Sequence, residues 1–452
     1  MSRTGLIRLA CVLSLSGALV ACDDEPESHL KAFQAEREDQ LIGGDVAMAR
    51  VGDYILENDK IRIAILGEQS SPGPGVYGGT LVDADLQRVE ERYRGGRGHD
   101  QFAEIFPFAN LLVPKPGGTD ISVVNDGSDG KAAIVRVSAE GAFFLHALGV
   151  LEELLENEVL KELFEDVRIH LRFETDYILE PGASYVRMVT RATRVGSSEG
   201  AGECAELTSC DLECATGLAY DEVGCLLCEC APEGVERLTH FTESTSIFEG
   251  ALGEATKGIE PGLVAGDFTF FGAQNDLFAP GMGFDEERAV FEPLFEGRDP
   301  FTYPLALDYM AAAGGAVSYG YFSVNGPGET EPRVLVPIIT SSTTAFSTSE
   351  LRCGDDDPEC RRATSWEFER YLAVGDGDIA SIADIVHELR GTPTGRLEGA
   401  VLTQQVTPAA NARVFVIADP DPDRDWTSVH ELTQANRALT GMPGVMNAID
   451  AD

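Results

Sequence analysis

Residues 169–190 read IHLRFETDYILEPGASYVRMVT and decide the fold class of this chain. The stretch holds two segments rich in β-branched and aromatic residues, Ile169–Phe173 and Tyr185–Thr190, separated by a Pro-Gly pair. Short runs of this kind, bounded by Gly and Pro, are typical of β-strands joined by turns. The stretch therefore predicts two strands.

The same rhythm continues over most of the chain. From Ile42 onward, Gly and Pro recur at about the 8–12-residue spacing that is typical of all-β domains. Further strands are expected at Arg62–Leu66, Ile121–Val124, Ala133–Val137, Gly266–Gly272, Ala316–Val324, Arg333–Thr340 and Glu367–Val374. We therefore predict a mainly β chain, with a large antiparallel β-sandwich over 41–390 that is interrupted at 200–235.

One segment departs from this pattern. In 148–166, LGVLEELLENEVLKELFED, leucines and a valine recur at i, i+3 and i+4 while acidic residues fill the remaining positions. This period predicts one amphipathic helix that covers an edge or end of a sheet. The strand rhythm and the phrase TDYILEPG at 175–182 resemble the wide supersandwich of galactose-mutarotase-like proteins.

The first residues predict export. Residues 1–8 carry Arg3 and Arg8, and residues 9–21 are almost wholly apolar but shorter than the ~20 residues that span a bilayer as a helix. The run Leu19-Val20-Ala21-Cys22 resembles a bacterial lipobox, which implies cleavage after 1–21, lipidation of Cys22 and a membrane-anchored lipoprotein on the periplasmic or cell-surface side. An ordinary signal peptide is the alternative. The polar segment 22–40 is expected to be a tether.

Composition limits the partners of this protein. The chain has 452 residues and a formal net charge of −42, which excludes binding to nucleic acid or to an anionic membrane face. The length predicts two or three domains. Partners that stay open are the membrane through the N-terminal lipid, a serine protease and a carbohydrate.

Six of the ten cysteines lie close together: Cys204, Cys210, Cys214, Cys225, Cys228 and Cys230. Zinc knuckles favour pairs of C-x-x-C, and only Cys225 and Cys228 have that spacing. An oxidising compartment favours disulfides, so we expect three here, with fifteen connectivities open. A further bridge is expected between Cys353 and Cys360, on either side of an acidic loop.

The spacing from Cys210 to Cys230, with Gly217, Asp221 and Gly224 between the cysteines, resembles the antistasin-like domain of serine protease inhibitors. This resemblance covers 204–230 and implies that Asp211 and Leu212 flank the inhibitory bond. Asp211 would repel the carboxylate at the base of a trypsin-like pocket, so a protease that accepts acidic side chains is the expected target. A disulfide-bonded surface excursion without inhibitory activity is the other interpretation.

The C-terminal segment carries another resemblance. Pro408, Ala412, Val414 and Val416, with a strand that begins near Gly399, resemble the opening of a carboxypeptidase-regulatory-like domain. The family implies a small transthyretin-like β-sandwich without a catalytic group, of which 395–452 would be an incomplete copy. Long lipoproteins of this layout suggest a third alternative, in which the chain is the non-catalytic N-terminal part of a metal-dependent hydrolase.

The remaining residues give no enzymatic motif. The seven histidines are isolated in sequence, and no Gly-x-Ser-x-Gly elbow is present. Residues 98–104, GHDQFAE, place a histidine and two acids in one loop, which indicates either a pocket or a surface histidine with no catalytic role. The Gly-rich loop 70–85 indicates a turn-rich loop or a phosphate cradle. We predict a non-enzymatic exported binding protein without catalytic residues, metal or cofactor.

Overall fold

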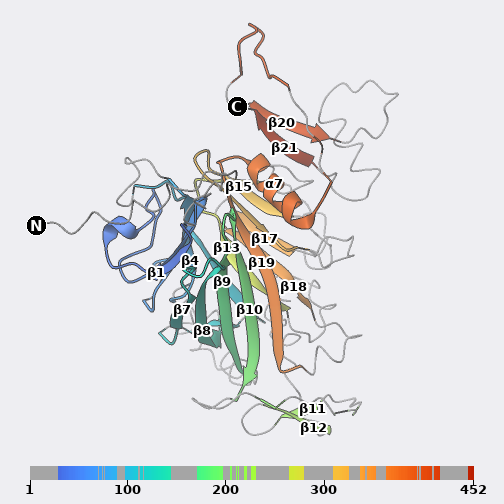
Figure 1. Ribbon diagram of the computed structural model, residues 1–452. Helices are drawn as coiled ribbons and strands as arrows, with labels where there is room; N and C mark the ends of the chain where they lie inside the picture. The colour runs from blue at the N-terminus through green and yellow to red at the C-terminus, as the bar shows by residue number, and fades with distance from the viewer. Residues whose placement is uncertain are drawn as a thin grey trace, which may run out of the picture.

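The computed structural model describes the chain from residue 29 to residue 451 with internal gaps. The gaps are residues 70, 74, 76, 89–96, 110–111, 116, 144–169, 197–203, 206–209, 211, 213–217, 221–224, 231–263, 279–308, 325–335, 342–343, 353–362, 394, 396–398, 410–411 and 418–445. Strands dominate the described residues, and they pair antiparallel throughout both large sheets (Figure 1).

The first sheet has the strand order β1-β2-β3-β4-β5-β13-β18-β17, with β6 beside β5. Its strands are β1 Lys31–Gln34, β2 Tyr54–Glu57, β3 Ile61–Ile65, β4 Leu81–Leu86, β5 Glu104–Ala109, β6 Leu112–Pro114, β13 Val264–Phe270, β17 Val336–Ser341 and β18 Thr344–Arg352. The sequence predicts β3, β13 and β17, and these three predictions are confirmed.

The second sheet has the strand order β7-β8-β9-β10-β19-β16-β15-β14. Its strands are β7 Asp120–Asn125, β8 Ala133–Phe143, β9 His170–Leu179, β10 Tyr185–Val195, β14 Asp276–Phe278, β15 Met310–Ala313, β16 Ser318–Phe322 and β19 Ser365–Gly375. The last residues of β8 also pair with β6 of the first sheet, so one hydrogen-bonded network of seventeen strands includes both layers.

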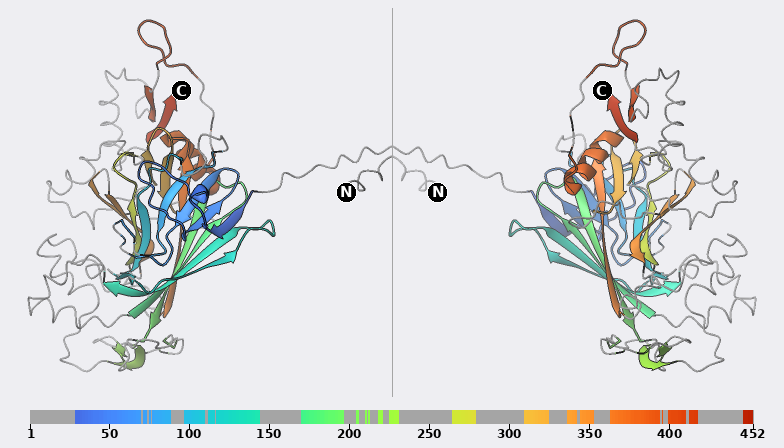
Figure 2. Two further views of the ribbon diagram at one scale, coloured as in Figure 1. Left: turned by 90° about the vertical axis from the view of Figure 1, so that its left-hand side faces the viewer. Right: turned by 90° about the vertical axis from the view of Figure 1, so that its right-hand side faces the viewer.

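The main core lies between the two sheets. Residues in β9 alternate between buried and half-buried, as they do in a strand with one face toward a core and one toward solvent. Ile63 and Leu81 of the first sheet pack in one cluster with Val186 and Leu372 of the second. The large antiparallel β-sandwich predicted from the sequence is therefore confirmed, and Figure 2 shows its layers edge-on.

A buried ion pair crosses this core. Arg370 of β19 donates from Nη2 to Oδ1 of Asp267 in β13 at 2.6 Å, and both side chains are almost wholly buried. Its Nη1 donates to Thr190 at 2.6 Å, and the hydroxyl of Tyr321 donates to Asp267 at 2.7 Å. The charged groups of Arg370 and Asp267 are thus both hydrogen-bonded inside the core. The pair therefore fixes how the two sheets face each other.

One α-helix, α7 (Ile379–Arg390), lies within the described residues and was not predicted. Asp378 caps its N-terminus by accepting from the Ser381 N–H, and Gly391 ends it in the left-handed conformation at φ 62°. Its buried side chains, including Ile382 and Val386, pack against β16 and β19 at one end of the sandwich. The helix predicted at 148–166 lies outside the described residues.

Part of the predicted 22–40 tether belongs to the folded domain. Residues Lys31–Gln34 form β1 at the edge of the first sheet, with Leu30 and Ala32 buried. Residues Glu38–Gln40 follow as the short 3-10 helix η1. The sequence analysis missed β1 because the segment is rich in charged residues, which an edge strand tolerates on its exposed face.

Two small hairpins complete the described elements. β11 (Leu218–Tyr220) pairs with β12 (Leu226–Cys230) inside the predicted 200–235 interruption, at the end of the sandwich opposite α7 (Figure 1). β20 (Ala412–Ile417) pairs with β21 (Met446–Ala451) in the C-terminal segment, and β20 coincides with the strand predicted there.

Candidate functional site

The outer face of the second sheet carries a regular array of polar side chains. Strands β8, β9, β10 and β19 pair in register, so their outward residues form straight rows across the sheet. The rows are Arg136–Asp176–Val189–Glu369, Ser138–Glu174–Arg191–Glu367 and Glu140–Arg172–Thr193–Ser365. Neighbours in such rows lie roughly 4.5–5.5 Å apart at Cβ. We name these residues the polar face.

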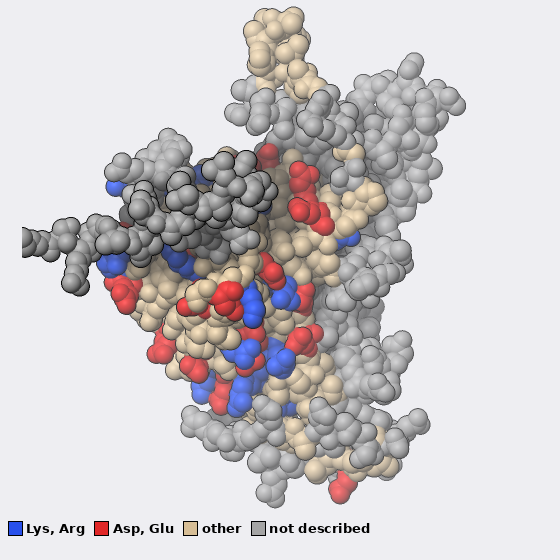
Figure 3. Space-filling model, in the orientation of Figure 1, with Lys and Arg blue, Asp and Glu red and all other residues tan. Residues whose placement is uncertain are grey.

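Ion pairs link the rows of the polar face. Arg136 binds Asp176 through two parallel hydrogen bonds of 2.7 Å, and this contact raises the pKa of the Arg136 guanidinium. Arg191 donates to Glu367 at 2.7 Å and lies 3.6 Å from Glu174. About half of the Arg191 side chain is exposed at 51%. Figure 3 shows acidic and basic side chains interleaved over this side of the molecule.

Two tyrosines lie at the end of the polar face near α7. The rings of Tyr185 and Tyr371 meet edge to face with centroids 5.5 Å apart. The Tyr371 hydroxyl donates to Glu369, and Arg187 donates to the same carboxylate at 3.0 Å. Burial first, and the Glu369 carboxylate second, raise the pKa of Tyr371, so its phenol remains a hydrogen-bond donor. The face thus offers guanidinium, carboxylate, hydroxyl and aromatic groups together.

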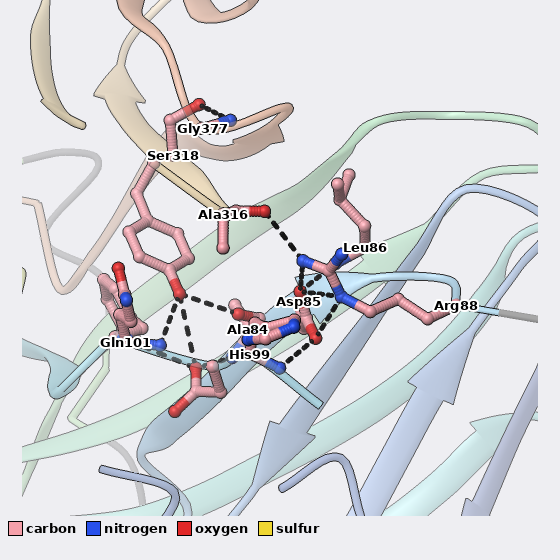
Figure 4. Close-up of polar contacts among 12 residues, drawn as sticks. Ala84, Asp85, Leu86, Arg88, His99, Gln101, Ala316, Ser318 and Gly377 are labelled. Atoms are coloured by element: carbon pink, nitrogen blue, oxygen red, sulfur yellow. Dashed lines mark hydrogen bonds and ion pairs between the residues drawn. The ribbon is translucent and has the colours of Figure 1, made fainter. Parts of the chain in front are cut away.

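Figure 4 shows the polar contacts around His99 and Gln101 of the 98–104 stretch, which the sequence analysis identified. The buried Asp85 accepts from the His99 N–H at 2.7 Å and from the Arg88 guanidinium at 2.8 Å. Arg88 also donates to the Ala316 carbonyl at 2.7 Å. His99 itself is half-buried. Asp85 and Arg88 therefore hold the loop against the β15–β16 turn.

Asp100 occupies the interior of this cluster. Its Oδ1 accepts from the Ala84 N–H at 2.7 Å and from the Phe102 N–H at 3.2 Å. The Tyr319 hydroxyl accepts from the Gln101 N–H at 2.8 Å and donates to the Ala84 carbonyl at 2.9 Å. Burial and the nearby Asp83 carboxylate raise the pKa of Asp100 well above its ordinary value, which favours the neutral acid.

Asp83 and Asp53 continue the same pattern on the first sheet. Asp83 accepts from the N–H groups of Met48 and Ala49 at 2.7 and 3.1 Å, and burial raises its pKa to about 6. Asp53 accepts from the Gly67 N–H at 2.7 Å, and burial raises its pKa too. These carboxyls supply hydrogen-bond partners to irregular backbone that covers the sheet. Their role is structural anchoring.

Glu104 holds the Gly-rich loop in the same way, and this loop is shorter than the predicted 70–85 because residues 81–85 belong to β4. Its oxygens accept from the Gly75 N–H and the Thr80 hydroxyl, each at 2.7 Å, and burial raises its pKa. A Cβ atom on Gly73 or Gly75 would lie 2.6 Å from a Glu104 oxygen, which explains the glycines. The Gly75 N–H therefore binds the Glu104 carboxylate and is not free to bind a phosphate. The structure agrees better with a turn-rich loop than with a phosphate cradle.

The described cysteines are in disulfides. Cys204 pairs with Cys225 and Cys210 pairs with Cys228, with Cα atoms 5.4 and 5.5 Å apart, and Cys230 is also disulfide-bonded. Leu212, two residues after Cys210, is 42% exposed. The other predicted site residues lie outside the described residues; they are Cys22, Asp211, Cys214, Cys353 and Cys360.

The described residues contain neither a metal-binding cluster nor a membrane-spanning helix. There, no group of three or more His, Cys, Asp or Glu side chains is arranged to hold a metal ion. None of the helices in that part of the chain has the length and apolar character needed to cross a membrane.

No protein-family model and no curated protein matches this chain. Among solved structures, it is similar to "a putative aldose 1-epimerase from Klebsiella pneumoniae subsp. pneumoniae MGH 78578", with a TM-score of 0.26 and 10% sequence identity. The alignment covers 77% of this chain and 87% of that chain. The strand order and core described above, and not this distant likeness, establish the β-sandwich.

The likeness corrects one prediction. The sequence analysis expected a non-enzymatic chain, whereas the Klebsiella protein is described as an epimerase, which is an enzyme. The expectation that this chain is not an enzyme is therefore wrong and is dropped.

The sequence analysis missed the polar face, although its signal is visible in 169–190. Charged residues alternate there with uncharged ones: Arg172, Glu174 and Asp176 face outward between Leu171, Phe173 and Thr175, which face inward. The alternation identifies the outward residues. Which strands lie beside them depends on the register between distant segments, and no local pattern encodes that register.

Proposed function

We propose that this chain is an exported binding protein of the carbohydrate-binding type, and that the polar face is its binding surface. The observation that carries the proposal is the in-register array of arginines and carboxylates over β8, β9, β10 and β19. Alternatives that need a metal or a catalytic histidine receive less support from the described residues.

The chemistry of the polar face suits a sugar. Each hydroxyl of a carbohydrate donates one hydrogen bond and accepts others, so adjacent hydroxyls need donors and acceptors side by side. Arg191 and Glu367 supply such a pair, and the planar guanidinium holds its donors in fixed directions. With roughly half of each side chain exposed, these groups can exchange water for ligand at low desolvation cost.

Charge balance favours a neutral glycan. Acidic and basic side chains alternate on the polar face, so it has no strongly positive field that would attract an anionic polymer. A face of this kind recognises hydroxyl geometry instead of charge. We therefore propose a neutral or weakly charged carbohydrate as the ligand class.

Export is part of the proposal. The disulfides among the clustered cysteines support an oxidising compartment, because cytosolic proteins rarely keep such bonds. Lipidation of Cys22 and membrane anchoring, on the periplasmic or cell-surface side, extend this proposal and rest on the lipobox-like sequence. Mass spectrometry of the exported protein tests both, since an uncut N-terminus would contradict them.

The ligand is tested on a glycan array with the full chain. We expect binding to at least one neutral glycan, and at least tenfold weaker binding for Arg191→Gln and for Glu367→Gln. Arg37→Gln is the matched control, because Arg37 forms an exposed ion pair with Asp39 outside the polar face. The control should bind like the wild type.

Two results would refute the proposal that the polar face binds a carbohydrate. One is the absence of binding to every glycan on the array at millimolar concentration. The other is glycan binding that neither polar-face variant weakens. Binding that requires residues 200–235 would also exclude the polar face as the site.

A second candidate function is serine protease inhibition by the disulfide-bonded segment. The exposure of Leu212 beside the disulfide-bonded Cys210 favours it, because an inhibitory bond must project from a stiff support. Disulfides that hold a loop in its bound shape reduce the entropy lost on binding.

A panel of serine proteases tests this second candidate with the full chain. We expect slowing of an enzyme that prefers acidic side chains, and loss of that effect in Leu212→Gly. If no protease of the panel is slowed, the inhibitory role is refuted while the carbohydrate proposal is unaffected.

A further inference from the structure

Arg194, one residue before the end of β10, has two buried guanidinium nitrogens to which the described residues offer no hydrogen-bond partner. The residue is 8% exposed and faces inward between the two sheets. Its Nε and Nη1 atoms are buried and have no hydrogen-bond partner among the described residues. An unpaired buried charge is costly, so such a group normally meets an opposite charge.

Other arginines of the chain meet this requirement with carboxylates of the chain itself. The pairs are Arg62–Glu57, Arg88–Asp85, Arg136–Asp176, Arg187–Glu369, Arg191–Glu367 and Arg370–Asp267. The chain has 76 acidic residues against 34 basic ones, so carboxylates are abundant. Among the described residues, Arg194 has no such ion pair, and its buried Nε and Nη1 lack a hydrogen-bond partner.

Two described neighbours of Arg194 are apolar. Its guanidinium lies over the ring of Trp366, 5.2 Å from the ring centroid, and Leu171 is its pairing neighbour on β9. Trp366 and Leu171 belong to one buried cluster. In such a poorly hydrated environment an electrostatic contact is stronger than in water, and the indole face holds the cation in place.

The position of Arg194 is at the end of the sandwich away from α7. Its N–H donates to the Thr364 carbonyl at 2.7 Å, and its carbonyl accepts from the Cys204 N–H at 3.2 Å. Cys204 is in the disulfide-bonded segment that holds β11 and β12, which Figure 1 shows below the end of β10. Arg194 thus lies where the two sheets meet that segment.

We propose that Arg194 and Trp366 form a binding site for an oxyanion group, a carboxylate or a sulfate or phosphate, on a ligand that enters at this end of the sandwich. The guanidinium supplies directed N–H donors to planar or tetrahedral anionic oxygens. The site lies on the inner side of β10, opposite the polar face, because Thr193 faces outward and Arg194 inward. It is independent of the carbohydrate proposal.

Tryptophan fluorescence tests this site directly. The chain has two tryptophans, so Trp426→Phe leaves Trp366 as the single reporter in the full-length protein. Sodium acetate, glucuronate, sulfate and phosphate are titrated separately, with sodium chloride holding the ionic strength constant. We expect a saturable change in emission and a rise in melting temperature with at least one of these anions.

Variants in the Trp426→Phe background identify the residue responsible. Arg194→Met removes the charge from apolar surroundings and should fold, because a well-packed apolar side chain replaces an unpaired ion there. It should lose both the fluorescence change and the anion-dependent rise in melting temperature. Arg62→Met is the matched control, since Arg62 is already paired with Glu57, and it should keep both responses.

The separate anions distinguish the ligand sources. A response to acetate and glucuronate alone assigns a carboxylate, and a response to sulfate or phosphate alone assigns a tetrahedral oxyanion. If none of the four anions changes the emission, or if Arg194→Met keeps the response, the site is refuted. Neither result changes the glycan-array outcome, which depends on the other face of β10.

Discussion

At the scale of single residues, this protein buries several charged groups and gives each a distinct role. Asp53, Asp83 and Asp85 accept from backbone N–H groups of segments that cover the first sheet, whereas Asp100 lies in such a segment and accepts from the Ala84 N–H of β4. Arg370 instead ties one sheet to the other through Asp267. Buried charges of this kind cost little while fully paired and much when one partner is removed.

Removing the Arg370 charge should show this asymmetry. Arg370→Met leaves the Asp267 carboxylate buried without its counter-ion, so we expect a loss of about 3–5 kcal/mol in the free energy of unfolding. Adding Asp267→Leu to that variant should recover most of the loss, because no unpaired charge then remains. Urea denaturation measures both values.

A double variant no more stable than Arg370→Met alone would contradict this account. In that case, the lost stability would come from the shape of the arginine side chain, which also lies over the Phe368 ring at 4.8 Å.

These residue roles could be predicted from the sequence only in part. The alternation in β19 identifies Arg370 as inward-facing, because it lies between Glu369 and Tyr371 in a strand of alternating burial. Its partner Asp267 is 103 residues away, and only the packing of two sheets brings them together. The 98–104 acids were noticed as a cluster, but their anchoring role depends on backbone N–H groups that no motif encodes.

At the scale of elements, strands followed from composition more reliably than the helix did. Tyr185–Thr190 and Glu367–Val374 were expected as strands because β-branched and aromatic residues fill them, and β10 and β19 contain them. The helix α7 was missed, although Asp378 before it and Gly391 after it are ordinary boundary signals. The apolar residues of α7 recur over a shorter stretch than those of 148–166, and the sequence analysis did not identify them as a helix.

The Asp378 cap should contribute measurably to stability. Its carboxylate accepts from the Ser381 N–H at 2.8 Å, so Asp378→Ala leaves that donor without its cap. We expect a loss of about 0.5–2 kcal/mol in the free energy of unfolding. Asp384→Ala, at an exposed position of the same helix, is the control and should change it by less than about 0.5 kcal/mol.

The measurement is urea denaturation at neutral pH with both variants in parallel. Equal effects of the two substitutions would show that the cap does not stabilise α7 beyond the general effect of losing a carboxylate.

At the scale of the whole molecule, the buried acids make stability depend on pH. Burial raises the pKa of Asp83 to about 6, above the ~3.9 of an exposed aspartate in the unfolded chain. Between these values the folded state binds more protons than the unfolded state. Its free energy of unfolding therefore rises as the pH falls from above 6 toward 4.

Asp83→Asn removes this titration and should flatten the dependence. We expect a smaller difference in unfolding free energy between pH 7.5 and pH 5 for Asp83→Asn than for the wild type. Asp384→Asn, at an exposed site, should keep the wild-type slope. Urea denaturation at pH 7.5, 6 and 5 measures the slopes, and an unchanged slope in Asp83→Asn would assign the effect to other carboxyls.

The double membership of β8 has a consequence for access to the interior. β8 pairs with β6 of the first sheet and with β7 and β9 of the second, so backbone hydrogen bonds join the two sheets along that edge. The two sheets cannot separate at that edge without breaking these hydrogen bonds. A ligand of the proposed Arg194 site must therefore approach by a route that leaves the β6–β8 pairing intact.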